Sequence, residues 1–269
     1  MQGEAAKVHK SWPYFLEVDR QSFHDAHKLL HAFVTAIRLA SDVRLKLGHY
    51  AIKDDEFGIS LHDPLPTLSA SAWGHYGKTL DLEALHFAQR YAPRLAHFSM
   101  RQSFNRVSNA IRLYESALDL IPSDVALVVF VSVLEGLFST ATQELSYRLG
   151  LSVSAFLAAS VDEKLTLFKE VRDLYTLRSK VVHGDRVHAD EEQTAIQLAE
   201  NYVPSIEEIV RRALRKILEE ELEGFIETTK HLDEFYQFLV LGFSLDQALE
   251  RVGLKRNKSR ESGKNTDKE

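Results

Sequence analysis

Residues 125–134, VALVVFVSVL, form the segment that most limits how this chain can fold. Every position except Ser132 is apolar, so a helix built from this segment has no polar side to turn toward water. The run is about half as long as a helix needs to cross a bilayer. The segment therefore predicts a helix enclosed by other helices. We place it at 124–149, with a Ser123 or Asp124 cap at its start and Gly150 at its end.

Most of the remaining chain also has helical periodicity. Apolar residues recur every three or four positions at 22–40 and again from residue 98 onward. Pro93 is expected to interrupt a short helix at 80–92, and the Gly-, Pro- and Ser-rich stretch before it predicts irregular structure with at most a small hairpin. The fold class is therefore mainly α. We divide the chain into an N-terminal helical and irregular segment at 1–97, a helical bundle at 98–222, C-terminal helices at 223–253 and a disordered tail at 254–269.

Composition excludes several chemistries. The chain has no cysteine, so it forms neither disulfides nor thiolate metal sites. His24, His27 and His31 share a helical face, but no closing fourth ligand is evident, and no metal or cofactor is predicted. The formal net charge of -6 gives no general reason to expect DNA or a membrane as a partner, although a local basic patch can bind phosphate. Residues 1–15 lack the apolar core of a signal peptide, so the predicted location is cytoplasmic.

The segment LRSKVVHGDRV, at 177–187, carries an arginine where a helix should be apolar. On a helical wheel Arg178 lies in the middle of the apolar stripe of its own helix. An unpaired guanidinium in a core is very costly, so the arginine needs a carboxylate or phosphate partner, or must border a cleft. Glu135 and Glu144 are the candidate partners within the chain.

The helix that carries Arg178 has clear predicted ends. Ser160 and Glu163 form a capping pattern at its start, and Gly184 is expected to stop it. His183 therefore stands at the helix end, about 140° around the wheel from Arg178. The two side chains do not share a face, and a cleft between two copies in a dimer would bring them together. Imidazole titrates near neutral pH and can move protons, while a guanidinium stabilises charge on a phosphate, which suits phosphodiester cleavage.

Four further segments can be compared with known families. They are the central pattern around Leu134 and Glu135, ELSYRL at 144–149, LYTLRSKVVHG at 174–184 and EEIVRRALRKIL at 207–218. Together they resemble the Apea-like branch of the HEPN superfamily, and the resemblance covers roughly residues 100–220. It implies an up-and-down helical bundle that dimerises, with Arg178 and His183 in the two fixed positions of an R-x4-H motif at the dimer cleft. It further implies a metal-independent endoribonuclease that acts on RNA without a cofactor, in defence or stress response.

Three further residues belong to the predicted site. Glu144 is a candidate to orient the catalytic groups and Arg148 a candidate second phosphate contact; the other reading of this i,i+4 pair is a plain ion pair on the central helix. Ser179 follows the motif arginine, where active superfamily members commonly carry Asn, Asp or His. This departure favours the alternative function, a non-catalytic HEPN-like module for dimerisation or partner binding, in which Arg178 is structural.

Overall fold

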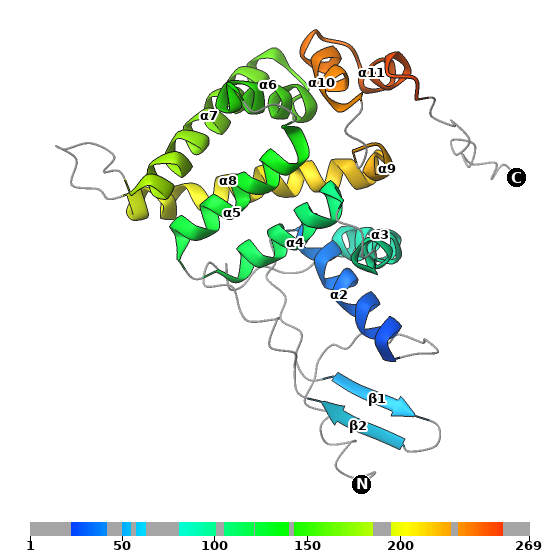
Figure 1. Ribbon diagram of the computed structural model, residues 1–269. Coiled ribbons are helices and arrows are strands. Elements are labelled where there is room, and N and C mark those ends of the chain that lie inside the picture. The colour runs from blue at the N-terminus through cyan, green and yellow to red at the C-terminus, as the bar shows by residue number, and fades with distance from the viewer. Residues whose placement is uncertain are drawn as a thin grey trace, which may run out of the picture.

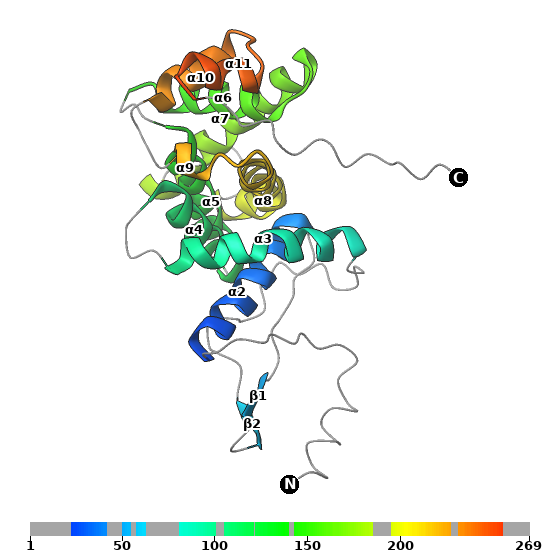
Figure 2. The same ribbon diagram turned by 90° about the vertical axis from the view of Figure 1, so that its right-hand side faces the viewer.

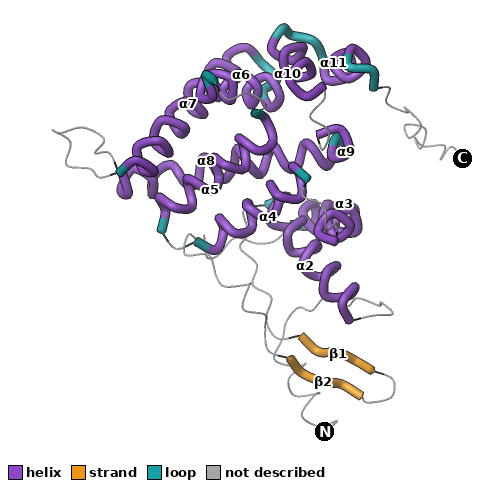
Figure 3. The backbone as a smooth tube through the Cα atoms, in the orientation of Figure 1, coloured by secondary structure: helices purple, strands orange, loops and turns teal. Residues whose placement is uncertain are grey.

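The computed structural model describes residues 23–41, 50–54, 58–62, 81–100, 105–120, 122–139, 143–184, 195–226 and 231–254. These residues form a packed helical bundle and one two-stranded antiparallel sheet (Figures 1 and 3), so the mainly α prediction is confirmed. The elements are α2 (Phe23–Ala40), β1 (Tyr50–Asp54), β2 (Gly58–His62), α3 (Leu82–Met100), α4 (Arg106–Asp119), α5 (Ser123–Phe138), α6 (Leu145–Leu157), α7 (Val161–His183), α8 (Ala195–Glu219), α9 (Glu223–Ile226), α10 (Leu232–Val240) and α11 (Leu245–Arg251).

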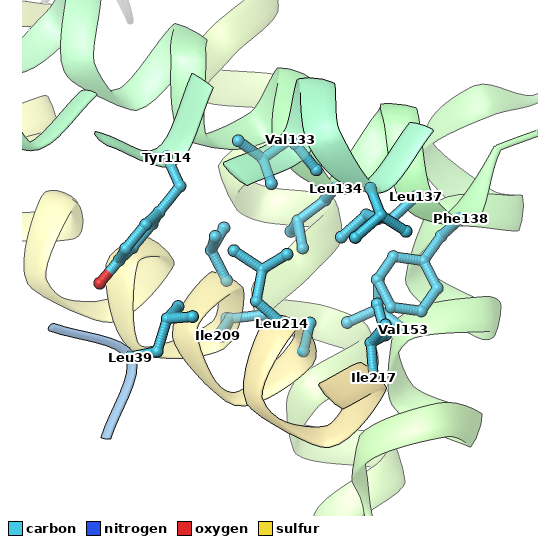
Figure 4. Packing of buried hydrophobic residues seen from close by; sticks show 14 of the residues in the cluster. Leu39, Tyr114, Val133, Leu134, Leu137, Phe138, Val153, Ile209, Leu214 and Ile217 are labelled. Carbon is cyan, nitrogen blue, oxygen red and sulfur yellow. The ribbon is translucent and has the colours of Figure 1, made fainter. Parts of the chain in front are cut away.

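Helix α5 is the centre of the bundle. It runs between α4 and α8 and also contacts α6 and α7 (Figures 1 and 2). Its side chains meet residues of α4, α6 and α8 in the core, as the packing of Leu134, Val153 and Leu214 illustrates (Figure 4). The expectation that this apolar segment is enclosed by other helices is therefore confirmed. Its buried residues are Ser123, Ala126, Leu127, Phe130, Val131, Val133, Leu134, Leu137 and Phe138.

The predicted central helix at 124–149 is in fact two helices. α5 ends at Phe138, where the side chain of Arg106 on α4 donates from Nη1 to the carbonyls of Gly136 (2.7 Å) and Ser139 (3.0 Å). These bonds satisfy carbonyl groups that a helix end leaves open, so the break is stabilised from a neighbouring helix. Gly150, predicted to end the helix, lies inside α6 and is buried. A Cβ added there would lie 2.9 Å from Cδ2 of Phe168, so the glycine allows α6 and α7 to approach closely.

Two other predicted boundaries are wrong. α3 continues through Pro93 to Met100, and the buried Tyr91 and Leu95 on either side of the proline belong to the core cluster. Burial of these residues offsets the one backbone hydrogen bond that proline removes. The N-cap of α5 is Pro122, without a side-chain cap, and Ser123 is a buried residue of the first turn instead.

Helices α2 and α3 attach to the bundle through the shared hydrophobic core and through polar contacts. α2 packs along α3, and the hydroxyl of Tyr114 on α4 donates to the carbonyl of Arg38 on α2 (3.0 Å). Arg94 on α3 donates to the carbonyl of Leu218 (3.2 Å) and pairs with the buried carboxylate of Glu223. Burial raises the pKa of that carboxyl group. The β1–β2 hairpin lies apart from the helices (Figure 2) and supplies the small hairpin that the sequence allowed.

The C-terminal helices α10 and α11 are confirmed. Ser244 begins α11 with a capping box that it forms with Gln247. The predicted disordered tail lies outside the described residues, apart from Leu254. Among the helices that the structure describes, none is both long enough and apolar enough to span a membrane.

Candidate functional site

Helix α7 positions the two motif residues, and its ends are those that the sequence predicts. Ser160 accepts a hydrogen bond from the backbone N–H of Glu163 (3.1 Å), and the Glu163 side chain accepts from the backbone N–H of Ala159 (2.9 Å). At the other end Gly184 is left-handed, with φ 68°, and its N–H bonds to the carbonyls of Lys180 and Val181. Only glycine adopts this conformation without strain, so the helix stops directly after His183.

Arg178 extends from α7 toward α5, where it meets Glu135. Nη2 of Arg178 lies 3.6 Å from Oε2 of Glu135, and the two side chains are 26% and 22% exposed. Of the two candidate carboxylates, the structure thus selects Glu135. The contact is an ion pair at the margin of the core. Nε of Arg178 is buried and has no hydrogen-bond partner among the described residues.

Tyr175 completes the surroundings of this ion pair. Its ring centroid lies 5.8 Å from the guanidinium carbon of Arg178, one helical turn away, and its hydroxyl is close enough to Glu135 to hydrogen-bond it. Burial, followed by the negative charge of Glu135, raises the pKa of the Tyr175 hydroxyl, which therefore stays a neutral donor. Tyr175 is not among the site residues predicted from the sequence. Its spacing of three residues from Arg178 is the signal that would have predicted the contact.

His183 and Arg178 do not converge within one chain. The imidazole of His183 is exposed, and α7 stays helical through this residue, so the angle of about 140° between the two positions holds. Ser179 is half-buried beside Arg178. The chain therefore presents an exposed imidazole at the helix end and a partly exposed guanidinium on another side of the same helix.

Glu144 and Arg148 do not form the ion pair considered from the sequence. Glu144 precedes α6 in a left-handed conformation, with φ 54°, and its side chain is exposed. Arg148 instead contacts Asp233 at the start of α10, with Nη2 3.3 Å from Oδ2. Both residues flank the predicted site only in sequence, since no contact joins either to Arg178 or His183 among the described residues.

The side chains of His24 and His27 lie outside the residues whose side chains are described. Within the described part of the chain, no group of three histidine, aspartate or glutamate side chains is placed to hold a metal ion.

The sequence matches no family model, and comparison with curated proteins and with solved structures gives no match either. The resemblance to the HEPN superfamily therefore stays a prediction that rests on the motif residues. What the geometry provides is a helical bundle in which one helix carries Arg178, held by Glu135, and an exposed His183 at its end.

Proposed function

We propose that this protein is a metal-independent endoribonuclease in which Arg178 and His183 act on the RNA backbone. The observation that carries the proposal is the state of the two motif residues at the end of α7. His183 is exposed, and Arg178 keeps a quarter of its side chain exposed despite its contact with Glu135. A guanidinium with spare donors can bind a phosphate oxygen without leaving its place.

In this proposal the neutral imidazole of His183 removes the proton from a ribose 2′-hydroxyl. The 2′-oxygen attacks the adjacent phosphorus, and the bond from phosphorus to the 5′-oxygen breaks. The leaving 5′-oxygen takes a proton from the imidazolium that His183 has become, so the products are a 2′,3′-cyclic phosphate and a free 5′-hydroxyl. Arg178 stabilises the charge that develops on the non-bridging oxygens, and no redox partner is required.

The proposed enzyme acts as a homodimer in the cytoplasm. Within one chain the two side chains point from different sides of α7, so a single copy does not surround a phosphate with both. A second copy would supply the missing half of each site.

A specific contact favours the alternative function. Glu135 and Tyr175 hold Arg178 in a way that ties α7 to α5, as expected if the arginine is structural. In that case the protein is a non-catalytic helical module for dimerisation or partner binding.

RNA cleavage by the purified full-length protein in EDTA distinguishes the two functions. The series compares wild type with His183→Ala and Arg178→Ala, and with His86→Ala as a control for an exposed histidine on another helix. Circular dichroism verifies that each variant is folded. The endoribonuclease predicts cleavage that both motif substitutions abolish and His86→Ala preserves, with cyclic phosphate ends on the products.

Glu135→Gln provides a second test. It removes the negative charge that pairs with Arg178 and leaves the arginine itself in place. The endoribonuclease retains cleavage in this variant. The structural reading predicts no cleavage by any variant, with Arg178→Ala and Glu135→Gln both lowering the free energy of unfolding.

A further inference from the structure

The exposed side of α7 that carries His183 has no acidic residue. We define the outer face of α7 as His183 together with the α7 residues that lie within about 40° of it on the helical wheel. All of them are exposed except Ser179, which is half-buried. The four acidic residues of α7 lie at least about 60° from His183. The outer face therefore gathers cations, hydroxyl groups and apolar groups at the edge of the bundle (Figure 1). Besides His183 it consists of Val161, Leu165, Lys169, Arg172, Thr176 and Ser179.

Arg172 is the central cation of this face. It lies within about 20° of His183 on the wheel and about 16 Å from it along the helix axis. Arg172 and Lys169 are exposed, and neither forms an ion pair with another residue that the structure describes. On α8, by contrast, Nε of Arg215 pairs with Oε1 of Glu219 at 2.7 Å. An exposed guanidinium without a carboxylate partner keeps its donors for a phosphate.

An aromatic pair borders the outer face where α7 meets α6. The rings of Phe168 and Tyr147 lie edge to face with centroids 5.6 Å apart, and the guanidinium carbon of Arg172 lies 5.4 Å from the Phe168 centroid. Tyr147 is 48% exposed, so a ligand can reach its ring. Gly150 of α6 fixes this arrangement, because its lack of a side chain lets Phe168 and Arg172 approach the α6 backbone. Aromatic rings beside cations suit single-stranded nucleic acid, whose bases stack while its phosphates contact the cations.

We propose that the outer face of α7, together with Tyr147, binds the RNA strand next to the phosphate that is cleaved. RNA as the ligand rests on the endoribonuclease proposed above. The scissile phosphate lies at His183, Arg172 contacts a phosphate further along the strand, and a base stacks on Tyr147. The axial distance from His183 to Phe168 is about 22 Å, which several nucleotides span. Cations without acids among them favour a polyanion over a protein surface.

Binding of an RNA that cannot be cleaved tests this face separately from catalysis. The probe is a fluorescently labelled single strand of about twelve nucleotides. Every ribose carries a 2′-O-methyl group, so no 2′-hydroxyl is present to attack phosphorus. Fluorescence anisotropy in low-salt buffer with EDTA measures the affinity of the full-length protein for the probe. Wild type is expected to bind, and its affinity should fall as salt rises, because phosphate contacts release counterions.

Arg172→Ala removes the proposed phosphate contact. It is expected to weaken binding about fivefold or more and to make the affinity less dependent on salt. Arg90→Ala is the matched control, because Arg90 is exposed on α3 and its guanidinium carbon lies 5.3 Å from the ring centroid of Tyr91. This control is expected to leave the affinity unchanged.

Tyr147→Ala removes the proposed stacking ring and is also expected to weaken binding about fivefold or more. Its matched control is Tyr202→Ala on α8, where the tyrosine is 39% exposed, and the expected affinity is that of wild type. Circular dichroism verifies that all four variants are folded.

A folded wild type that does not bind the probe in low salt overturns the proposal. Affinity that Arg172→Ala and Tyr147→Ala leave unchanged, or that the two controls lower equally, also overturns it. Probe binding in the expected pattern with natural RNA left uncut would reject the endoribonuclease and keep the binding face. Cleavage of natural RNA with unchanged affinity in both variants would reject the binding face and keep the endoribonuclease.

Discussion

Helices α5 and α7 belong to the same bundle but are built for different surroundings. α5 is apolar on nearly every side and is covered by neighbours, so most of its residues are buried in the core. α7 buries Leu167, Val171, Leu174 and Leu177 on one side and carries charges, the motif histidine and exposed apolar groups on the others. The difference teaches that α5 contributes to the fold mainly through its place in the core, while α7 contributes one side to the core and leaves its other sides exposed.

The largest expected effect is on α5. Phe130→Ala removes a ring that is 1% exposed and contacts Tyr114, with ring centroids 6.1 Å apart. Loss of a buried aromatic side chain and the cavity left behind should lower the free energy of unfolding by about 3–5 kcal/mol. Leu165→Ala on the outer side of α7 is the matched comparison and should change it by less than about 0.5 kcal/mol. Urea denaturation measures the free energy of unfolding of both variants. Equal losses would contradict the contrast between the buried side of α5 and the outer side of α7.

A second prediction concerns the tight contact between α6 and α7. Gly150→Ala forces a methyl group against the Phe168 ring and should cost about 1–3 kcal/mol. Gly136 on α5 is the control, because a Cβ added there meets no atom within 4 Å. Gly136→Ala should instead stabilise the protein by about 0.5–1 kcal/mol through helix propensity. Thermal or urea unfolding decides the sign of each change, and destabilisation by both would show that α5 tolerates no added atom either.

The third prediction addresses the contact that joins the two helices. A double-mutant cycle with Glu135→Ala and Arg178→Ala should give a coupling free energy of about 1 kcal/mol, since the pair is only partly buried. The exposed pair Arg215 and Glu219 should give about 0.3–0.5 kcal/mol in the same urea measurements. Coupling no larger than in the exposed pair would mean that Arg178 does not tie α7 to α5.

The smallest expected effect lies at the first turn of α7. The Ala159 N–H and then the Arg212 guanidinium lower the pKa of the Glu163 carboxyl group. A carboxylate whose pKa is lower in the folded state stabilises the protein above its unfolded pKa, and this stabilisation is lost as pH falls through the folded pKa. Glu163→Gln should therefore cost about 0.5 kcal/mol at neutral pH after allowance for solvent screening. Unfolding followed over pH should show variant and wild type converging in acid; a gap that widens there would contradict the assignment.

The sequence predicts α7 well because the signals for its ends are local. Ser160 and Gly184 mark the first and last turns, and the wheel places Arg178 against the core, where Glu135 meets it. The end of α5 could not be predicted in this way. Apolar residues continue to Phe138, and the group that terminates the helix, Arg106, lies on another element.

For the same reason, the sequence predicts only part of the candidate site. The motif spacing identifies Arg178 and His183, but the partner of Arg148 is Asp233, which lies 85 residues further along the chain. Gly150 looks like a helix end from its neighbours alone, and only the position of Phe168 on the next helix explains it. Local sequence patterns do not reveal contacts between segments that lie far apart in the chain.

The left-handed Gly184 has an evolutionary consequence. Because it ends α7 immediately after His183, the direction of the imidazole is set by the helix and not by the chain that follows. Insertions or deletions after Gly184 should therefore leave the histidine in place, since longer connections cost little free energy. We expect relatives of this chain to vary in length directly after Gly184 while retaining the glycine itself, and a new sequence that inserts residues between His183 and the glycine should belong to a protein with a different site.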